Sequence, residues 1–135
     1  MQLMLDTCVC VAVIRRSPAS VLERLLAHPV GSVGISAITL AELELGVAKS
    51  REAARNREAL ARFLLALEVA SFDEPAAAAY GPVRAQLEAE GRSIGSLDML
   101  IGAHAHSLAV PLATTNAGEL RRIHGLEVLD WLAAS

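Results

Sequence analysis

Residues 3–7 read Leu-Met-Leu-Asp-Thr, so three apolar residues are followed at once by an aspartate and a threonine. A short apolar run that ends at a polar residue is typical of a strand buried in a sheet. The Asp6 carboxylate can cap a following helix or belong to a functional site, and one carboxylate can do both. The stretch therefore predicts a buried first strand with a polar side chain at its carboxyl end.

Short apolar runs alternate with helical segments along the rest of the chain. We expect strands over 3–5, 30–35, 68–72, 109–114 and 127–129, and helices over 8–15, 20–28, 39–49, 51–67, 75–90, 97–108 and 117–124. This alternation predicts one α/β domain over residues 1–135, a mainly parallel sheet of four to five strands flanked by helices. Ligands of such sheets bind beyond the carboxyl ends of the strands, which here are followed by Asp6, Thr7, Thr114, Thr115 and Asn116.

The composition narrows the class of protein. The chain has 135 residues, is 53% hydrophobic and carries a net charge of -3, which excludes a disordered chain, and its 2 Cys exclude a disulfide scaffold. No apolar run approaches the roughly 18 to 20 residues of a membrane span, and no signal peptide is recognised. We therefore expect a cytoplasmic protein without a membrane partner, in which Cys8 and Cys10 are reduced.

Glu42 is the second acidic candidate, in the helix expected over 39–49. It stands three residues after Thr39 and so fits a capping box, in which its side chain would serve only the helix start. Glu42 and Glu44 point to different sides of a helix, so only one of them can face a site. Gly46, one turn beyond Glu42, would leave room there for a ligand or a neighbouring backbone.

Asp98 is the third acidic candidate, in the first turn of a helix. Its position favours interaction with the helix dipole, yet Gly102 and Ala105 on the same face predict close packing to the sheet near a site. Three converging carboxylates repel one another unless a cation lies between them, and hard oxygen ligands favour Mg²⁺ or Mn²⁺. Completed by Asn116, such a cluster would activate water for displacement at a phosphodiester.

Several segments together resemble the PIN-domain fold and, within it, the VapC-like ribonuclease toxins of bacterial toxin–antitoxin pairs. The resemblance covers nearly the whole chain, through residues 4–7, 35–43 with Gly46, 91–98, 101–105, 114–116 and 125–131. It implies a three-layer PIN-like fold and a metal-dependent endoribonuclease. It also implies Asp6, Glu42 and Asp98 as the acidic core, bound Mg²⁺ or Mn²⁺, an RNA substrate, a cognate antitoxin and a homodimer. The resemblance, not the spacing, selects Glu42 over Glu44.

The sequence departs from the family pattern near the expected site. Cys8 stands where the family commonly has Asn, and the neutral Asn116 stands where it often has Asp. Glu119 is either a fourth carboxylate or a solvated helix residue, and with Thr7, Thr114 and Thr115 it is expected to support the acidic core. These departures leave an alternative function, a catalytically weak module that binds RNA or an antitoxin.

Two arginine pairs are candidate phosphate ligands: Arg15 with Arg16, and Arg121 with Arg122. Ordinary solvated surface is the other interpretation of each. The apolar surface of the helices expected over 8–15, 20–28 and 51–67 forms core or, as the resemblance implies, docks an antitoxin and a second protomer. A phosphotransferase with an aspartate nucleophile fits poorly, because Cys8 stands where a second Asp is needed. A receiver domain fits poorly because the only lysine, Lys49, lies in a helix.

Overall fold

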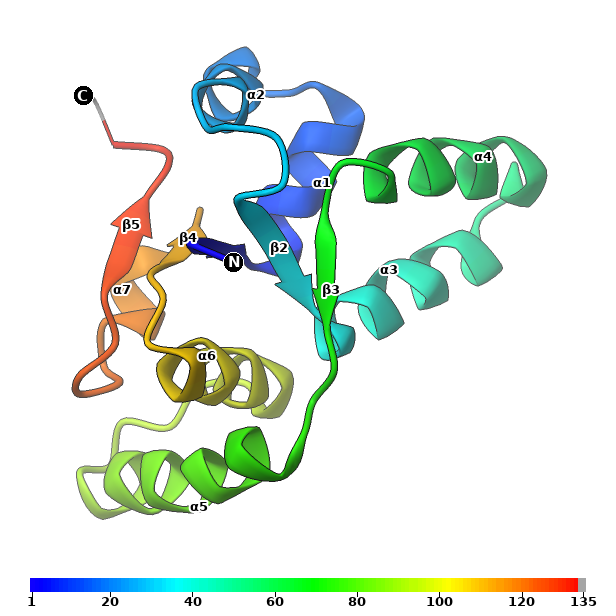
Figure 1. Cartoon of the computed structure of the whole chain (residues 1–135). Coiled ribbons are helices and arrows are strands. Elements are labelled where there is room, and N and C mark those ends of the chain that lie inside the picture. Colours follow the sequence, from blue (N-terminus) through cyan, green and yellow to red (C-terminus); the bar gives the residue numbers. More distant parts are fainter. Residues whose placement is uncertain (134–135) are drawn as a thin grey trace.

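The structure of the protein is a computed structural model that describes residues 1–133 (Figure 1). Five strands form one sheet in the order β3-β2-β1-β4-β5, and every neighbouring pair is parallel. The strands are β1 (Leu3–Leu5), β2 (Val33–Ser36), β3 (Glu68–Ala70), β4 (Leu112–Thr114) and β5 (Val128–Asp130). The predicted α/β class and parallel sheet are confirmed, and the buried run at 3–5 is the central strand.

Helices cover both faces of the sheet, which makes three layers (Figure 1). One face is covered by α1 (Thr7–Arg15), α2 (Ala19–Leu26), α3 (Ala37–Lys49) and α4 (Ala53–Leu64), and the other by α5 (Glu74–Ala89), α6 (Ser96–Leu108) and α7 (Ala117–Leu120). Successive strand side chains point to opposite faces. Leu3 and Leu5 therefore join the core under α1, and Met4 joins the core under α6.

Three strands are shorter than the sequence predicts: β3 ends at Ala70 rather than at residue 72, and β2 and β4 begin late for backbone reasons. β2 begins at Val33 rather than at residue 30, because Gly31 has a φ of 87° and the Ser32 N–H donates to the Pro29 carbonyl at 3.1 Å, which closes a turn. β4 begins at Leu112 rather than at residue 109, because Ala109 ends α6 in the left-handed conformation with a φ of 54°. Pro111 then has no N–H to offer a ladder.

Helix starts also differ from the prediction. The α3 helix begins at Ala37, where the Ser36 hydroxyl accepts from the Ile38 N–H at 3.0 Å. Thr39 is therefore inside the helix, so the capping box expected between Thr39 and Glu42 is wrong. Glu42 therefore does not cap the start of α3. It lies in the second turn of that helix, and its side chain is free for other contacts.

The parallel arrangement places the carboxyl ends of β1, β2 and β4 side by side. Asp6 directly follows β1, α3 directly follows β2, and Thr115 and Asn116 directly follow β4. The sheet therefore brings together residues that lie more than 100 positions apart in sequence. In the described residues, no helix combines the length and the hydropathy needed to cross a membrane.

Candidate active site

The Asp6 side chain lies at the centre of the edge formed by the carboxyl ends of the strands, where it also caps α1. It is only 3% exposed. Its Oδ1 accepts from the Val9 N–H at 2.9 Å, which caps α1, and its Oδ2 accepts from the hydroxyl of Thr114 on the neighbouring strand. The two interpretations of this aspartate are therefore compatible, and both oxygens are held in fixed directions.

The electrostatics of Asp6 show acidic neighbours. The pKa of this carboxyl is raised from 3.8 to about 6, chiefly by burial and also by the negative charges of Asp98 and Glu42, against the lowering effect of the Thr114 and Val9 hydrogen bonds. The pKa of Asp98 is also raised, first by burial, then by the charges of Glu42 and Glu119. Because charges act strongly only over short distances, these four carboxylates share one region of the molecule.

Glu42 is held by Thr7. The Thr7 hydroxyl, in the first turn of α1, donates to Glu42 Oε1 at 2.7 Å and lies 3.4 Å from the Thr39 hydroxyl. Glu44 instead forms a surface ion pair with Arg57 of α4 at 3.0 Å. The structure thus directs Glu42 toward Asp6 and Asp98, and directs Glu44 away from them.

Asn116 and Glu119 form a polar extension of this region after β4. The Asn116 backbone N–H donates to Thr114 Oγ1 at 2.8 Å, and its side-chain amide donates to Glu119 Oε2 at 3.1 Å. Asn116 is solvent-exposed, whereas Glu119 is half-buried. The amide therefore orients Glu119, whose charge reaches Asp98, and Thr114 connects this pair to Asp6.

Cys8 borders the same carboxylates from α1. Burial raises the pKa of its thiol, the charges of Asp6 and Asp98 raise it as well, and a hydrogen bond from Thr115 lowers it. The thiol is therefore protonated at neutral pH. The sequence predicts a supporting role for Thr115, and in the structure Thr115 forms this hydrogen bond with Cys8.

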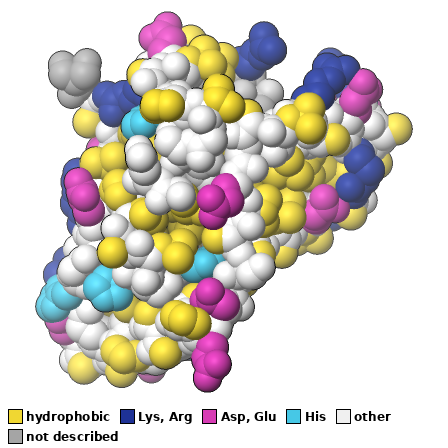
Figure 2. Space-filling model, in the orientation of Figure 1, with side chains coloured by type: hydrophobic (Ala, Val, Ile, Leu, Met, Phe, Trp, Pro, Cys, Tyr) yellow, Lys and Arg dark blue, Asp and Glu magenta, His cyan; other side chains and the backbone are white. Residues whose placement is uncertain are grey.

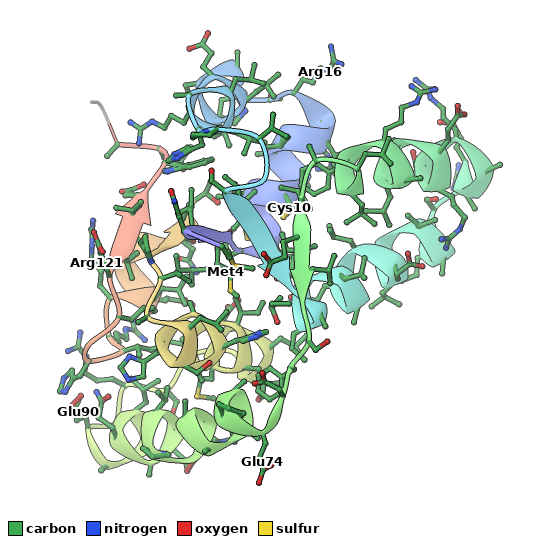
Figure 3. The ribbon with its side chains drawn as sticks, viewed as in Figure 1. Met4, Cys10, Arg16, Glu74, Glu90 and Arg121 are labelled. Atoms are coloured by element: carbon green, nitrogen blue, oxygen red, sulfur yellow. The ribbon has the colours of Figure 1, made fainter. Side chains whose placement is uncertain are left out.

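The four arginines do not form one patch. Arg15 lines a groove together with Thr7, Glu42 and Gly46, whereas Arg16 ends α1 about 15 Å along the helix axis from its start. Arg121 lies on the opposite side of the sheet from Arg16 (Figure 3). Arg122 donates to the Ser93 carbonyl at 3.3 Å and so braces the loop before α6.

Gly46 faces the groove beside Glu42. A Cβ built at Gly46 meets nothing within 4 Å, so the space that the sequence predicted there is open. The small face of α6 has a different neighbour from the one expected: a Cβ at Gly102 would collide with the side chain of Ile123. The close packing at Gly102 is therefore to the segment after α7 rather than to the sheet.

The donor set at this edge suits a hard divalent cation. Asp6, Glu42, Asp98 and Glu119 offer carboxylate oxygens, and within residues 1–133 none of them forms an ion pair with Arg, Lys or His. In the same residues, no three His, Cys, Asp or Glu side chains lie close enough to hold a metal ion as they stand. These carboxylates fit a divalent cation in charge and in ligand chemistry, and cation binding would require their side chains to move closer together.

The fold and this acidic edge define an α/β protein of the nuclease class. The family model described as PIN domain matches residues 3–134. The chain belongs to the PIN domain family.

Named relatives are similar over almost their whole length. A protein of Shigella flexneri named tRNA(fMet)-specific endonuclease VapC is 37% identical over 131 residues, 97% of this chain and 98% of the relative. Ribonuclease VapC2 of Rickettsia felis is 39% identical over 129 residues, 95% of this chain and 96% of the relative.

Solved structures agree with this assignment. The DNA-bound VapBC of Salmonella typhimurium superposes with a TM-score of 0.91 at 36% identity, covering 97% of this chain and 98% of that one. VapBC2 of Rickettsia felis, bound to a fragment of its promoter, gives a TM-score of 0.90 at 37% identity, with coverages of 96% and 98%. The three-layer PIN-like architecture expected from the sequence is thereby confirmed.

Proposed function

We propose that the protein is a metal-dependent endoribonuclease that acts as the toxin of a toxin–antitoxin pair. The observation that carries the proposal is that the charges of Asp98 and Glu42, from two other elements, help to raise the pKa of the buried Asp6 to about 6, while in residues 1–133 none of the three forms an ion pair with a cationic side chain. The names of the VapC relatives supply the reaction class.

In this proposal Asp6, Glu42 and Asp98 would hold Mg²⁺ or Mn²⁺. The bound cation would supply water activation and charge stabilisation for phosphodiester hydrolysis. The protein's own work is orientation: Thr114 and the Val9 N–H fix the two oxygens of Asp6, and Thr7 fixes Glu42. Hydrogen bonds of this kind set the direction and basicity of metal ligands.

Asn116 and Glu119 complete the proposed catalytic edge. Asn116 would act through Glu119, which its amide holds at 3.1 Å, and would line the approach of the scissile phosphate. Arg15 lines the groove that leads to Glu42, so it is the arginine best placed to contact an RNA phosphate. Arg16, Arg121 and Arg122 would contact more distant parts of the RNA backbone.

The experiment is cleavage of total RNA with and without EDTA, by the wild-type chain and by Asp6→Asn. We expect products only with Mg²⁺ or Mn²⁺, and a loss of more than about 100-fold in Asp6→Asn. Asp73→Asn is the matched control, because Asp73 caps α5 through the Ala76 N–H at 3.1 Å as Asp6 caps α1. The name of the relative from Shigella makes tRNA(fMet) the first purified substrate to test.

Equal cleavage by Asp6→Asn and wild type would overturn the site assignment. Cleavage that persists in EDTA would overturn the metal requirement. Retained RNA binding with no product under any metal would favour the alternative, a module that acts by binding RNA or an antitoxin.

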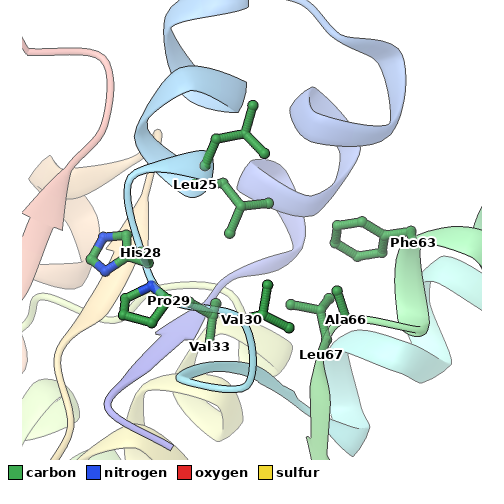
Figure 4. A pocket seen from close by; sticks show the side chains of 9 residues that line it. Leu25, His28, Pro29, Val30, Val33, Phe63, Ala66 and Leu67 are labelled. Carbon is green, nitrogen blue, oxygen red and sulfur yellow. The ribbon is translucent and has the colours of Figure 1, made fainter.

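We further propose that the antitoxin docks over α1, α2 and α4. Similar solved structures are VapBC complexes, and this face carries apolar hollows in the protein. One hollow of about 160 Å³, between the ends of α2 and α4, is lined by Leu25, Leu26, His28, Pro29, Val30, Val33, Phe63, Ala66 and Leu67 (Figure 4). Leu26 is 73% exposed and Val30 is 90% exposed, and a partner helix would bury both side chains.

The docking face is tested with charged substitutions at exposed positions. Leu26→Glu and Val30→Glu should weaken capture of the co-expressed antitoxin at least about tenfold without changing RNA cleavage by the free toxin. Leu108→Glu is the control, because Leu108 is an exposed leucine of α6 on the other face of the sheet. Unchanged capture by both variants would place the antitoxin elsewhere.

A homodimer is the state that we propose for the free toxin.

A further inference from the structure

Two of the buried polar residues have no part in the site as described so far. The buried polar side chains of the described residues are Asp6, Ser36, Thr39, His104 and Thr114. Asp6 and Thr114 bond each other, and Thr39 adjoins the Thr7–Glu42 pair. The remaining two bond each other: His104 Nδ1 lies 2.8 Å from Ser36 Oγ, and both residues are 0% exposed.

The neighbouring contacts favour one direction for this hydrogen bond. Ser36 Oγ accepts from the Ile38 N–H at the start of α3, and its own proton can be donated to His104 Nδ1. With Nδ1 as the acceptor the ring proton lies on Nε2, which has no partner at hydrogen-bond geometry in the described residues, although the Ser71 backbone is near enough to raise the pKa of the ring. Burial lowers the pKa of His104, in agreement with this neutral form.

This bond joins the two helices that carry two of the proposed metal ligands. Ser36 caps α3 six residues before Glu42, and His104 lies on α6 six residues after Asp98. The edge of the Phe72 ring packs on the imidazole, with ring centroids 5.3 Å apart at an interplanar angle of 78°, which holds the ring in place. A fully buried polar pair between two helices restricts how they slide past each other.

We infer that His104 is a positioning residue for the acidic site, which sets the separation of Asp98 and Glu42 through its hydrogen bond to Ser36. The inference rests on the proposed function, because it concerns the same metal-binding carboxylates. His104 touches neither metal nor RNA in this role. Its contribution is to keep α6 in register with the first turn of α3, so that the cation finds both carboxylates at the correct spacing.

A matched pair of substitutions separates this role from simple packing. His104→Asn places Oδ1 where Nδ1 stands and keeps the acceptor for Ser36, whereas His104→Leu has the same branched shape as Asn and no acceptor. Both lose the imidazole that packs against Phe72, so the melting temperature of each variant is measured beside its Mn²⁺ affinity. Mn²⁺ affinity, measured by calorimetry on the EDTA-stripped chain, should fall about 10- to 100-fold in His104→Leu and stay within about threefold of wild type in His104→Asn.

Two further variants keep the inference falsifiable. Ser36→Ala removes the same bond from the other helix and should weaken Mn²⁺ binding about tenfold, which tests the bond even when His104→Leu does not fold. His106→Leu is the control on the same helix, since His106 is exposed and contacts the Gly125 carbonyl, and its Mn²⁺ affinity should equal that of wild type.

Equal Mn²⁺ affinities in His104→Asn and His104→Leu, or an unchanged affinity in Ser36→Ala, would overturn the inference while wild type still cleaves RNA. A wild-type chain that binds no Mn²⁺ would overturn this inference together with the metal requirement of the proposed function. The two failures are therefore distinguishable by the behaviour of the wild-type protein alone.

Discussion

The carboxylate of Asp6 carries an energetic cost in the metal-free protein. Its side chain is buried, two of its neighbours are acidic, and the two hydrogen bonds that it accepts do not restore an ordinary pKa. A carboxyl with a pKa of about 6 in the folded chain and 3.8 in the unfolded chain binds its proton more tightly when folded. Linkage then requires the stability to fall as the pH rises through this window.

The first prediction concerns that window. Between pH 4 and pH 7, the stability of the metal-free wild type should fall relative to that of Asp6→Asn by about 3 kcal/mol, from about two pKa units at 1.36 kcal/mol each. Asn cannot ionise but still caps α1. Urea unfolding in EDTA at several pH values measures the difference, in which the titrating groups remote from Asp6 cancel. A stability difference between wild type and Asp6→Asn that does not change with pH would show that the surroundings of Asp6 do not raise its pKa.

Thr7 gives a second prediction at this scale. Its hydroxyl is the group that directs Glu42 Oε1 toward the site. Thr7→Val is nearly isosteric and removes the hydroxyl, so RNA cleavage should fall about 10- to 100-fold with little change in fold. Thr7→Ser keeps the hydroxyl and should retain most of the activity. Similar rates in Thr7→Val and Thr7→Ser would mean that Glu42 needs no such support.

At the scale of the elements, the two glycines inside α3 and α6 differ in their surroundings. Gly46 faces the open groove beside Glu42, and Gly102 faces Ile123 at contact distance. Glycine in a helix costs about 1 kcal/mol relative to alanine, so an alanine is favourable wherever there is room for its methyl group. The same substitution should therefore have opposite signs at the two positions.

We predict that Gly46→Ala raises the free energy of unfolding by about 0.5 to 1 kcal/mol, and that Gly102→Ala lowers it by about 1 to 3 kcal/mol through overpacking. Denaturant unfolding of both variants beside wild type gives the two signs directly. Stabilisation by Gly102→Ala would mean that Ile123 moves aside easily. Destabilisation by Gly46→Ala would mean that the groove beside Glu42 is narrower than the structure shows.

The elements were predictable from sequence to different degrees. The run at 3–5 and the helices were found because apolar patterning and capping residues act locally. The capping box at Thr39 failed because Ser36, three residues earlier, competes for the same helix start and lies directly at the end of β2. β4 begins later than its apolar pattern predicts because the left-handed conformation of Ala109 is not visible in that pattern, although Pro111 already indicates an end or edge position.

At the scale of the molecule, the strand order could not be read from the sequence, and the contacts that depend on it were missed. Thr114 meets Asp6 only because β4 lies beside β1, and His104 meets Ser36 only because α6 crosses under the start of α3. Asp6 and Asp98 are predicted as candidates from local signals, the end of an apolar strand and the first turn of a helix, whereas the choice of Glu42 over Glu44 comes from the resemblance. Their supporting hydrogen bonds carry no such signal.

On the surface of the whole molecule, the two proposed tasks meet at the groove beside Glu42, which α1, α3 and α4 line together. The carboxylates lie at one edge of the sheet, and apolar side chains gather over the outer helices, among them α3 and α4 in the view of Figure 2. Two arginines of α4 are paired with carboxylates, Arg57 with Glu44 of α3 and Arg62 with Glu58 of α4 itself. RNA phosphate must therefore be met by arginines that have no acidic partner in the described residues, such as Arg15.

The last prediction joins the site to the stability of the whole chain. A cation that binds only the folded state stabilises it by about 2.7 kcal/mol at a concentration 100 times its dissociation constant. For a chain of this size we therefore expect saturating Mn²⁺ to raise the melting temperature of the EDTA-stripped wild type by about 5 to 15 °C. The gain should exceed what the same ionic strength of NaCl gives, because the cation relieves repulsion among Asp6, Glu42 and Asp98.

Asp6→Asn and Asp73→Asn divide the possible outcomes of that measurement. Asp6→Asn should melt higher than wild type in EDTA, because the buried charge is gone, and should gain little from Mn²⁺. Asp73→Asn should respond to Mn²⁺ as wild type does, since Asp73 caps α5 and its charge is not among those that act on Asp6 or Asp98. A wild type that gains nothing from Mn²⁺ while it cleaves RNA would contradict a metal site at Asp6, because binding that supports catalysis must also stabilise the fold that creates the site.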